Sequence, residues 1–477
     1  MKTVFQKSVP GRSACLPPQP RQSAAQMLPA ELLRSSPPAL PELSELDVVR
    51  HFTHLSRLNF SVDSNFYPLG SCTMKYNAKF LEYVAALPGF TRLHPLLAQL
   101  DGAEAASQGA LELVYDMERW ICEITGMQAC TMQPMAGANG EFTGVMLIAA
   151  YHRDKGNKKT KIICPDAAHG TNPASAALAG YEVVSIASKD GMIDPQALED
   201  ALDDDVAGLM MTCPNTLGLY EQHMASIVEK LRRVDALLYY DGANLNAILG
   251  KLRVGDVGFD VIHLNLHKTL GTPHGGGGPG SGPVGVSKRL VPYLPAGRVE
   301  KKADGSFALS YNQPKSIGYM APFYGNFGVF LKACAYVTRL GGKGLERAAE
   351  YAVLNANYLR KMTEDFLVHP YPGICMHEFV ASAPEGTRAL DIGKALLDED
   401  IHAPTVYFPL IVPECLMTEP TETESKETLD HFVTVLREIV EKGKQAPDFL
   451  HNAPLKMAVR RLDETGAARN MVLTEDM

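Results

Sequence analysis

The sequence lacks the cysteine patterns of a disulfide scaffold or a zinc-binding module. Its nine cysteines are scattered through 477 residues, and none stands in a CxxC pair. An odd, irregularly spaced set in a long chain is typical of a reducing compartment. We therefore expect a cytoplasmic location and no structural disulfides, and we expect no metal site.

Long apolar runs and basic clusters are absent as well. No stretch of about 18 uncharged apolar residues occurs, so we expect no membrane-spanning helix. The opening residues, MKTVFQKSVPGRS, lack the apolar segment of a signal peptide, and we expect none. A net charge of −9 without a basic stripe argues against a nucleic-acid partner.

The glycine-rich stretch at residues 265–286 lacks the features of a nucleotide-binding loop. It reads NLHKTLGTPHGGGGPGSGPVGV, with no GK[ST] motif and no strand–GxGxxG–helix context. It does contain a lysine directly after a histidine. A lysine becomes a useful nucleophile when a site lowers its pKa or holds it as a Schiff base with a carbonyl cofactor. We interpret Lys268 as the carrier of pyridoxal phosphate (PLP), although a solvated surface charge is the commoner role of a single lysine.

The composition is that of an ordinary globular protein, with 46% hydrophobic and 21% charged residues. A chain of 477 residues is too long for one compact core. We expect three parts. They are an extended, proline-rich arm with a short helix at residues 1–60, a large domain at 61–335 and a small C-terminal α+β domain at 336–477.

Short apolar runs alternate with helical patterns in the middle of the chain. This alternation predicts an α/β fold with a mostly parallel sheet covered on both faces. The predicted strands are residues 161–164, 182–186, 207–212, 236–240, 261–264 and 284–286. The predicted helices are residues 173–179, 194–201 and 225–234, one from Asp47, and 109–126, 329–339, 344–364 and 424–442. Trp120, the one tryptophan, is predicted to lie in the core, and Gly126 to end its helix.

Asp241 directly follows the apolar run LLYY, so it is expected at the carboxyl edge of the sheet, where ligands bind. A buried aspartate there is costly unless it is paired. A protonated pyridine nitrogen would be such a partner, and it would keep the cofactor ring cationic. Ala243, two residues on, is small enough to lie beneath a ring.

Two further strand-end loops fit the same cofactor. In the turn QPMAGANGE, Gly137, Ala138 and Asn139 open a helix, whose bare N–H groups can bind a phosphate. His169, in AHGTNPAS, could stack its flat imidazole on a flat cofactor. Each has a simpler interpretation when taken alone, as a tight turn and as a capping histidine.

Six separated motifs, in the same order, resemble one known family, the glycine cleavage system P-proteins, or glycine dehydrogenases (decarboxylating). The match is to the catalytic subunit of the two-subunit form, subunit 2. The tail departs from it at residues 455–458, LKMA, where a more polar stretch is expected. The motifs are YPLGSCTMKYN, QPMAGANGE, AHGTNPAS, YDGANLNA, NLHKTLGTPHGGGGPG and EPTETESKETLD.

This resemblance implies a PLP-dependent transferase of fold type I, with a mostly parallel seven-stranded sheet. It implies Lys268 as the Schiff-base lysine, Asp241 as the pyridinium partner and His169 as the ring-stacking residue, all catalytic, with His267 beside the cofactor. The implied reaction is decarboxylation of glycine and transfer of the aminomethyl group to the lipoyl arm of H-protein. The implied partners are H-protein and the sister subunit 1, with two copies of each subunit.

Three questions stay open on the residues alone. His274 is a candidate proton donor near the lipoyl sulfur, and a structural role in a turn is an equal alternative. The glycines after it are expected to approach the cofactor closely or to move as a lid. Another PLP enzyme on the same fold, or a noncatalytic subunit, would share much of this pattern.

Overall fold

The computed structural model describes residues 2–15, 18, 21–100, 102–274 and 280–473. Contacts divide the chain into two units, Met1–Ser61 with Pro454–Met477, and Val62–Ala453. Every predicted site residue belongs to the second unit. The predicted glycine lid at residues 275–279 lies outside the described residues.

The second unit is built around a seven-stranded sheet of order β1-β9-β8-β7-β6-β2-β3. Strands β3, β2, β6, β7 and β8 are parallel, and β9 runs antiparallel to both of its neighbours. The mostly parallel sheet is therefore confirmed. Its strands are β1 (Ala129–Thr131), β2 (Lys161–Pro165), β3 (Glu182–Ile186), β6 (Val206–Thr212), β7 (Leu237–Gly242), β8 (Val261–Leu264) and β9 (Val284–Val286).

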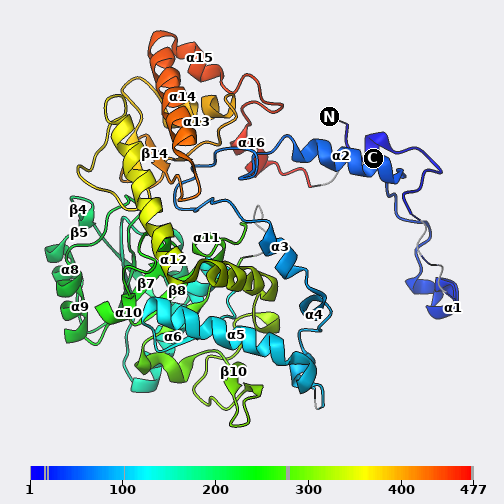
Figure 1. Ribbon diagram of the computed structural model, residues 1–477, viewed down its shortest axis with the longest axis horizontal. Helices are drawn as coiled ribbons and strands as arrows, with labels where there is room; N and C mark the ends of the chain where they lie inside the picture. Colours follow the sequence, from blue (N-terminus) through cyan, green and yellow to red (C-terminus); the bar gives the residue numbers. More distant parts are fainter. Residues whose placement is uncertain (1, 16–17, 19–20, 101, 275–279, 474–477) are drawn as a thin grey trace. The chain divides into compact units, whose positions relative to one another are not determined.

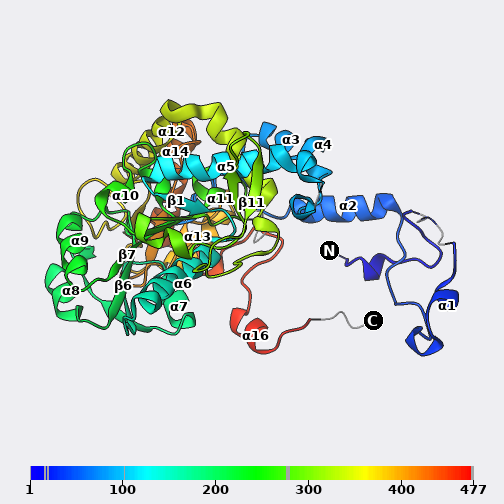
Figure 2. The same cartoon turned by 90° about the horizontal axis from the view of Figure 1, so that it is seen from below.

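Both faces of this sheet are buried, which explains why its strands are apolar without alternation. In β7, Leu237 and Tyr239 belong to the core cluster on one face, and Leu238 and Tyr240 to the cluster on the other. Figure 2 shows α6 (Gly137–Lys155) and α7 (Thr171–Leu178) on one side, and α5 (Glu104–Thr125) and α12 (Phe327–Thr363) on the other.

The three helices predicted between the strands form close to their predicted places, as α7, α8 (Pro195–Ala201) and α9 (Met224–Arg233). The short helices α10 (Val254–Val257) and α11 (Leu266–Thr269) were not predicted. Helix α5 ends at Gly126, whose left-handed φ of 75° suits a glycine. Trp120 is half-buried and packs against the core cluster. Strand β1, which is three residues long, was not predicted.

A second hydrophobic core lies in the C-terminal part of the same unit, where Leu359, Ile392, Leu416 and Phe432 meet. Figure 1 shows its helices together in orange. The elements are β12 (Phe379–Ser382), β13 (Thr405–Val406), β14 (Cys415–Thr418), α13 (Ala389–Leu397), α14 (Lys426–Gln445) and α15 (Pro447–Asn452). The two helices predicted around residue 340 are the halves of α12, which breaks at Gly341, where φ is 62° and ψ 178°.

Smaller elements complete the second unit. They are α3 (Phe80–Ala85), α4 (Pro88–Thr91), β4 (Ser188–Lys189), β5 (Met192–Ile193), β10 (Arg298–Lys301), β11 (Phe307–Ser310), η3 (Leu97–Gln99), η4 (Leu245–Ala247), η5 (Lys288–Tyr293) and η6 (Pro322–Tyr324). The predicted domain boundaries near residues 60 and 335 stay a proposal, supported by the two separate cores.

The first unit contains short helical elements joined by extended backbone. They are η1 (Phe5–Lys7), α1 (Ala24–Met27), η2 (Ala30–Leu32), α2 (Glu45–Ser56) and α16 (Glu464–Arg469). Helix α2 is the one predicted near Asp47, and Ser44 caps it by accepting from the Asp47 N–H. In the part of the chain that the structure describes, no helix is long and apolar enough to cross a membrane.

Candidate active site

The carboxyl ends of three parallel strands of the sheet bring the predicted residues together. His169 follows β2, Asp241 lies at the end of β7, and Lys268 lies in α11 just after β8. Such ends meet at one edge of the sheet. The pattern of apolar runs therefore predicted this convergence, and His169 Nδ1 lies 2.6 Å from Asp241 Oδ2.

Asp241 is fully buried and is held by donors on both carboxylate oxygens. Oδ2 accepts from Thr212 Oγ1 at 3.0 Å and Asn172 Nδ2 at 3.3 Å. Oδ1 accepts from the N–H of Ala243 at 3.0 Å. Burial alone would raise the pKa of Asp241, but His169, His263 and these hydrogen bonds hold it well below its usual range. The group is therefore a buried, ionised carboxylate.

His169 contacts its neighbours through its ring nitrogens. Its Nδ1 meets Asp241, and its Nε2 meets the hydroxyl of Ser71. The imidazole is 12% exposed. Both nitrogens are thereby engaged by polar partners in the plane of the ring, and the predicted stacking on a cofactor stays a prediction.

Lys268 lies half-buried in α11, with its Nζ donating to the carbonyl oxygen of Ser71 at 2.8 Å. The charge of Lys268 lowers the pKa values of two nearby histidines. Burial, and then the Lys268 charge, lower the pKa of His274 to about 4. Burial, His274 and Lys268 lower the pKa of His267 to about 3. Both histidines are therefore neutral near pH 7.

His267 and His274 lie beside each other, with ring centroids 5.1 Å apart. The Ser281 N–H donates to His267 Nδ1 at 3.2 Å, so His267 supports the chain where it enters β9. A direct contact of His267 with a cofactor stays a prediction. So does the role of His274 as a proton donor.

The amino end of α6 forms the other wall. Its N-cap residue is Ala136, and no side chain caps this end among the described residues. Gly137 lies so close to α11 that a Cβ there would be 2.5 Å from Asn265 Oδ1. The N–H groups at Gly137, Ala138 and Asn139 therefore lie at a helix start beside Asn265, which precedes Lys268 by three residues. A helix start of this kind binds anions.

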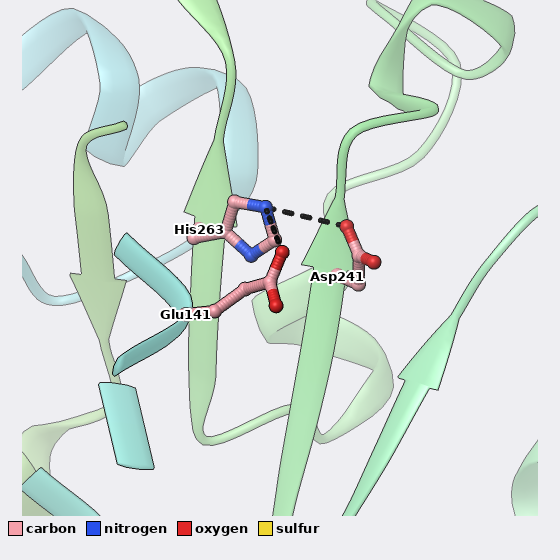
Figure 3. A group of neighbouring side chains, drawn as sticks. All are labelled: Glu141, Asp241 and His263. Carbon is pink, nitrogen blue, oxygen red and sulfur yellow. Dashed lines mark ion pairs between the residues drawn. The ribbon is translucent and has the colours of Figure 1, made fainter. Parts of the chain in front are cut away.

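A second buried carboxylate faces Asp241 across a histidine (Figure 3). Glu141 from α6, Asp241 from β7 and His263 from β8 converge, with His263 Nε2 3.3 Å from Asp241 Oδ1 and 3.9 Å from Glu141 Oε1. Burial, and then the charge of Asp241, raise the pKa of Glu141 to about 8. Burial lowers the pKa of His263 to about 4. Near pH 7 Glu141 is therefore protonated and His263 neutral, while Asp241 stays ionised.

Sequence reasoning missed several of these neighbours. Ser71 stands in the motif YPLGSCTMKYN, where it received no role, although polar residues recur there at 71, 73 and 75. His263 was passed over inside the strand VIHL, where a histidine among apolar residues was the available signal. Thr212 carried no signal, because only the pairing of β6 with β7 brings it to Asp241.

The residues present fit PLP. An ionised buried carboxylate, a half-buried lysine and an uncapped helix start match a pyridinium, an aldehyde and a phosphate. Buried polar atoms without a partner among the described residues also flank the lysine. They are Asn265 Oδ1, Thr269 Oγ1, Thr272 Oγ1 and Ser281 Oγ.

Comparison with known proteins gives two family matches and many close relatives. Residues 29–309 match the profile of the glycine cleavage system P-protein, and residues 348–458 that of the glycine dehydrogenase C-terminal domain. The chain is 52% identical over 482 residues to the probable glycine dehydrogenase (decarboxylating) subunit 2 of Listeria innocua, covering 99% of this chain and 98% of the relative. It is 53% identical over 479 residues to the protein of the same name from Caldanaerobacter subterraneus, covering 98% of each.

Among solved structures, a glycine decarboxylase (P-protein) in inhibitor-bound form superposes with a TM-score of 0.73 at 21% identity, covering 87% of this chain and 94% of that one. An aspartate aminotransferase from Thermus thermophilus superposes with a TM-score of 0.58 at 13% identity, covering 79% and 99%. These likenesses concern the fold, and they confirm the predicted fold type I.

Proposed function

The chain belongs to the glycine cleavage system P-protein family, and from this membership we propose that it is a PLP-dependent enzyme that decarboxylates glycine. The observation that carries the proposal is the meeting of Lys268 and the ionised Asp241 at one edge of the sheet, beside His169 and the start of α6. A noncatalytic subunit has no need to keep a carboxylate buried and charged there, because burying a charge is costly.

When bound, PLP supplies an electron sink for the pair of electrons released as the carboxyl group of glycine leaves as CO₂. The residues of the chain bind and orient. Lys268 offers the amine that holds the cofactor, and Asp241 offers the negative charge that a pyridinium needs. The N–H groups of Gly137, Ala138 and Asn139 would bind the phosphate.

The remaining steps follow from the family. We propose that the aminomethyl group passes to the oxidised lipoyl arm of H-protein, and that the chain works with a sister subunit, two copies of each, in the cytoplasm. The neutral His274 stays a candidate for the proton transfer near the lipoyl sulfur. Relatives that are named subunit 2 support the existence of a sister chain.

The lysine assignment is tested by trapping. In the wild-type protein with PLP, borohydride should attach the cofactor to the peptide that contains Lys268, as seen by mass spectrometry. Lys268→Ala should lose the yellow colour and the adduct. As a matched control, Lys251→Ala removes a lysine whose Nζ pairs with Glu346 and Glu350, and it should keep both. A reducible adduct in Lys268→Ala at the same peptide would overturn the assignment.

The reaction is tested by exchange of labelled bicarbonate with the carboxyl group of glycine. The exchange should require PLP, the sister subunit and lipoylated H-protein together. An amino-acid decarboxylase or a cysteine desulfurase on the same fold would bind PLP without this lipoyl-dependent exchange.

A further inference from the structure

The segment 69–75, which reads LGSCTMK, has no role in the function proposed so far. Its alternate residues Ser71, Thr73 and Lys75 each contact a different glutamate of the C-terminal part. We infer that these three glutamates, Glu378, Glu419 and Glu422, are positioning residues that hold the segment against Lys268 and His169. This inference rests on the proposed function and extends it to residues outside the cofactor site.

The first contact joins Ser71 to Glu378. The Ser71 N–H donates to Glu378 Oε2 at 2.6 Å, and Asn244 Nδ2 donates to Glu378 Oε1 at 3.0 Å. Glu378 is fully buried. Because Asn244 follows β7 and Asp241, this carboxylate links the segment to the strand that carries the cofactor's partner.

The second contact joins Thr73 to Glu419. Both the N–H and the hydroxyl of Thr73 donate to this carboxylate, at 3.0 Å and 2.5 Å. Glu419 is fully buried, and it directly follows β14. His377, also fully buried, lies 3.9 Å from Glu419 and 4.0 Å from Glu378, so the two carboxylates lie on either side of one imidazole.

The third contact joins Lys75 to Glu422 at 2.6 Å. The same Nζ donates to Asn246 Oδ1 at 2.8 Å and to the carbonyl of Thr269 at 3.0 Å. Thr269 is the residue after Lys268. The segment is therefore fastened to the backbone of α11 itself.

The conformation of the segment requires such support. Ser71 and Thr73 have φ values of 63° and 47°, in the left-handed region that residues with a Cβ rarely adopt. Strained backbone of this kind persists when its surroundings hold it. In both residues the backbone N–H donates to a carboxyl oxygen, of Glu378 and of Glu419 respectively, which supports this conformation.

The segment is also attached to the C-terminal sheet. Leu69 pairs with Thr418 of β14, and the Gly70 N–H donates to the Met417 carbonyl at 3.2 Å. A Cβ at Gly70 would lie 2.3 Å from Met417 Cγ, so only glycine fits. The C-terminal part thus places the segment precisely along its whole length.

Two contacts carry this placement to the proposed catalytic groups. The Ser71 carbonyl accepts from Lys268 Nζ at 2.8 Å, and the Ser71 hydroxyl meets His169 Nε2. A shift of Ser71 would therefore move the partners of both residues at once. A displacement of about 1 Å in such a site can cost roughly 100-fold in rate.

The test uses the complex with its sister subunit, loaded with PLP. Glu378→Gln and Glu419→Gln should each raise hydrogen exchange in the peptide that spans 69–75. They should lower kcat for glycine–bicarbonate exchange by roughly 10- to 100-fold, with a smaller change in KM and with PLP still bound. Glu414→Gln is the matched control, because Glu414 holds the Ala389 N–H at 2.7 Å by a similar contact outside the segment. It should leave the hydrogen exchange of the peptide that spans 69–75, and kcat, at wild-type values.

Ser71→Ala is the second variant, because it keeps the backbone contacts and the fold and removes only the hydroxyl. It should lower kcat without raising hydrogen exchange. The inference is overturned if Glu378→Gln and Glu419→Gln both keep wild-type hydrogen exchange in the peptide that spans 69–75, or if their hydrogen exchange rises while kcat stays at the wild-type value. It is also overturned if the Glu414→Gln control loses as much kcat as they do. If the glutamine variants do not fold, wild-type kcat in Ser71→Ala overturns it. A wild-type complex that binds no PLP would instead refute the proposed function. Hydrogen exchange of the peptide that spans 69–75 would still show whether Glu378 and Glu419 hold the segment.

Discussion

Asp241 and Glu141 are both buried carboxylates, and their surroundings move their pKa values in opposite directions. Asp241 receives hydrogen bonds on both oxygens and faces His169. Glu141 accepts from Thr171 Oγ1 at 2.8 Å but faces the charge of Asp241. One carboxylate therefore stays ionised and the other protonated near pH 7, and the ionised one lies where a pyridinium is proposed.

Asp241→Asn should separate cofactor binding from chemistry. We expect PLP to bind and decarboxylation to slow by about 100- to 1,000-fold, the loss that is typical of one electrostatic catalytic contact. The measurement is kcat for the exchange reaction, with PLP content followed by absorbance. Asp154→Asn is the control, since Asp154 pairs with Lys315 near the far end of α6. Near-normal turnover in Asp241→Asn would refute the electrostatic role.

Glu118 makes stability depend on pH. Burial raises its pKa to about 8, because α5 places it in a largely apolar cavity, and Arg298 opposes the rise. The folded pKa lies above the ordinary value of 4.5, so the favourable contribution is complete below pH 4.5 and is lost as the pH rises towards 8.

Glu118→Gln should remove this dependence. We expect the unfolding free energy of the variant, relative to wild type, to rise by roughly 3–5 kcal/mol between pH 4.5 and pH 8, at about 1.4 kcal/mol per pH unit. Urea unfolding at several pH values measures it. Parallel curves for the two proteins would contradict the prediction.

At the scale of elements, α6 connects the site to the sheet. Its start opens towards Lys268, and its middle packs on β7 and β8. The contact is close at Gly144, where a Cβ would lie 2.3 Å from Tyr239 Cε2 and 2.9 Å from Val261 Cγ1. The helix start is therefore held in place by a glycine that lies two turns away from it.

Gly144→Ala should destabilise the protein by about 1–3 kcal/mol, because the added methyl group overpacks the helix–sheet contact. Gly109→Ala is the matched control in α5, where a Cβ would meet nothing within 4 Å. It should be neutral or stabilising by up to about 1 kcal/mol. Thermal unfolding of both variants tests the pair, and equal stability would show that the close contact has no cost.

At the scale of the whole molecule, the C-terminal core and the sheet domain contribute differently. The sheet domain carries Lys268, Asp241 and His169. The C-terminal part carries the glutamates that hold the segment 69–75. The two family matches end at residue 309 and begin again at residue 348, on either side of the boundary that we propose near 335.

Much of the site could be predicted because strand ends are a local signal. The run LLYY marks β7, and Asp241 ends it, while VIHL marks β8 and precedes Lys268. A parallel sheet then brings such ends to one edge. The contacts of Ser71 with Glu378 could not be predicted, because 307 residues separate the two and no periodicity links them.

The sequence by itself determined six of the seven strands of the large sheet, the longer helices, the break near Gly341 and the candidate residues Lys268, Asp241 and His169. These depend on apolar patterning and on backbone preferences, which act over a few residues. Only the tertiary structure decided that Asp241 stays ionised beside a protonated Glu141, and that glutamates of the C-terminal part hold the segment 69–75. Those outcomes depend on burial and on donors from distant strands, and both exist only after the chain has folded.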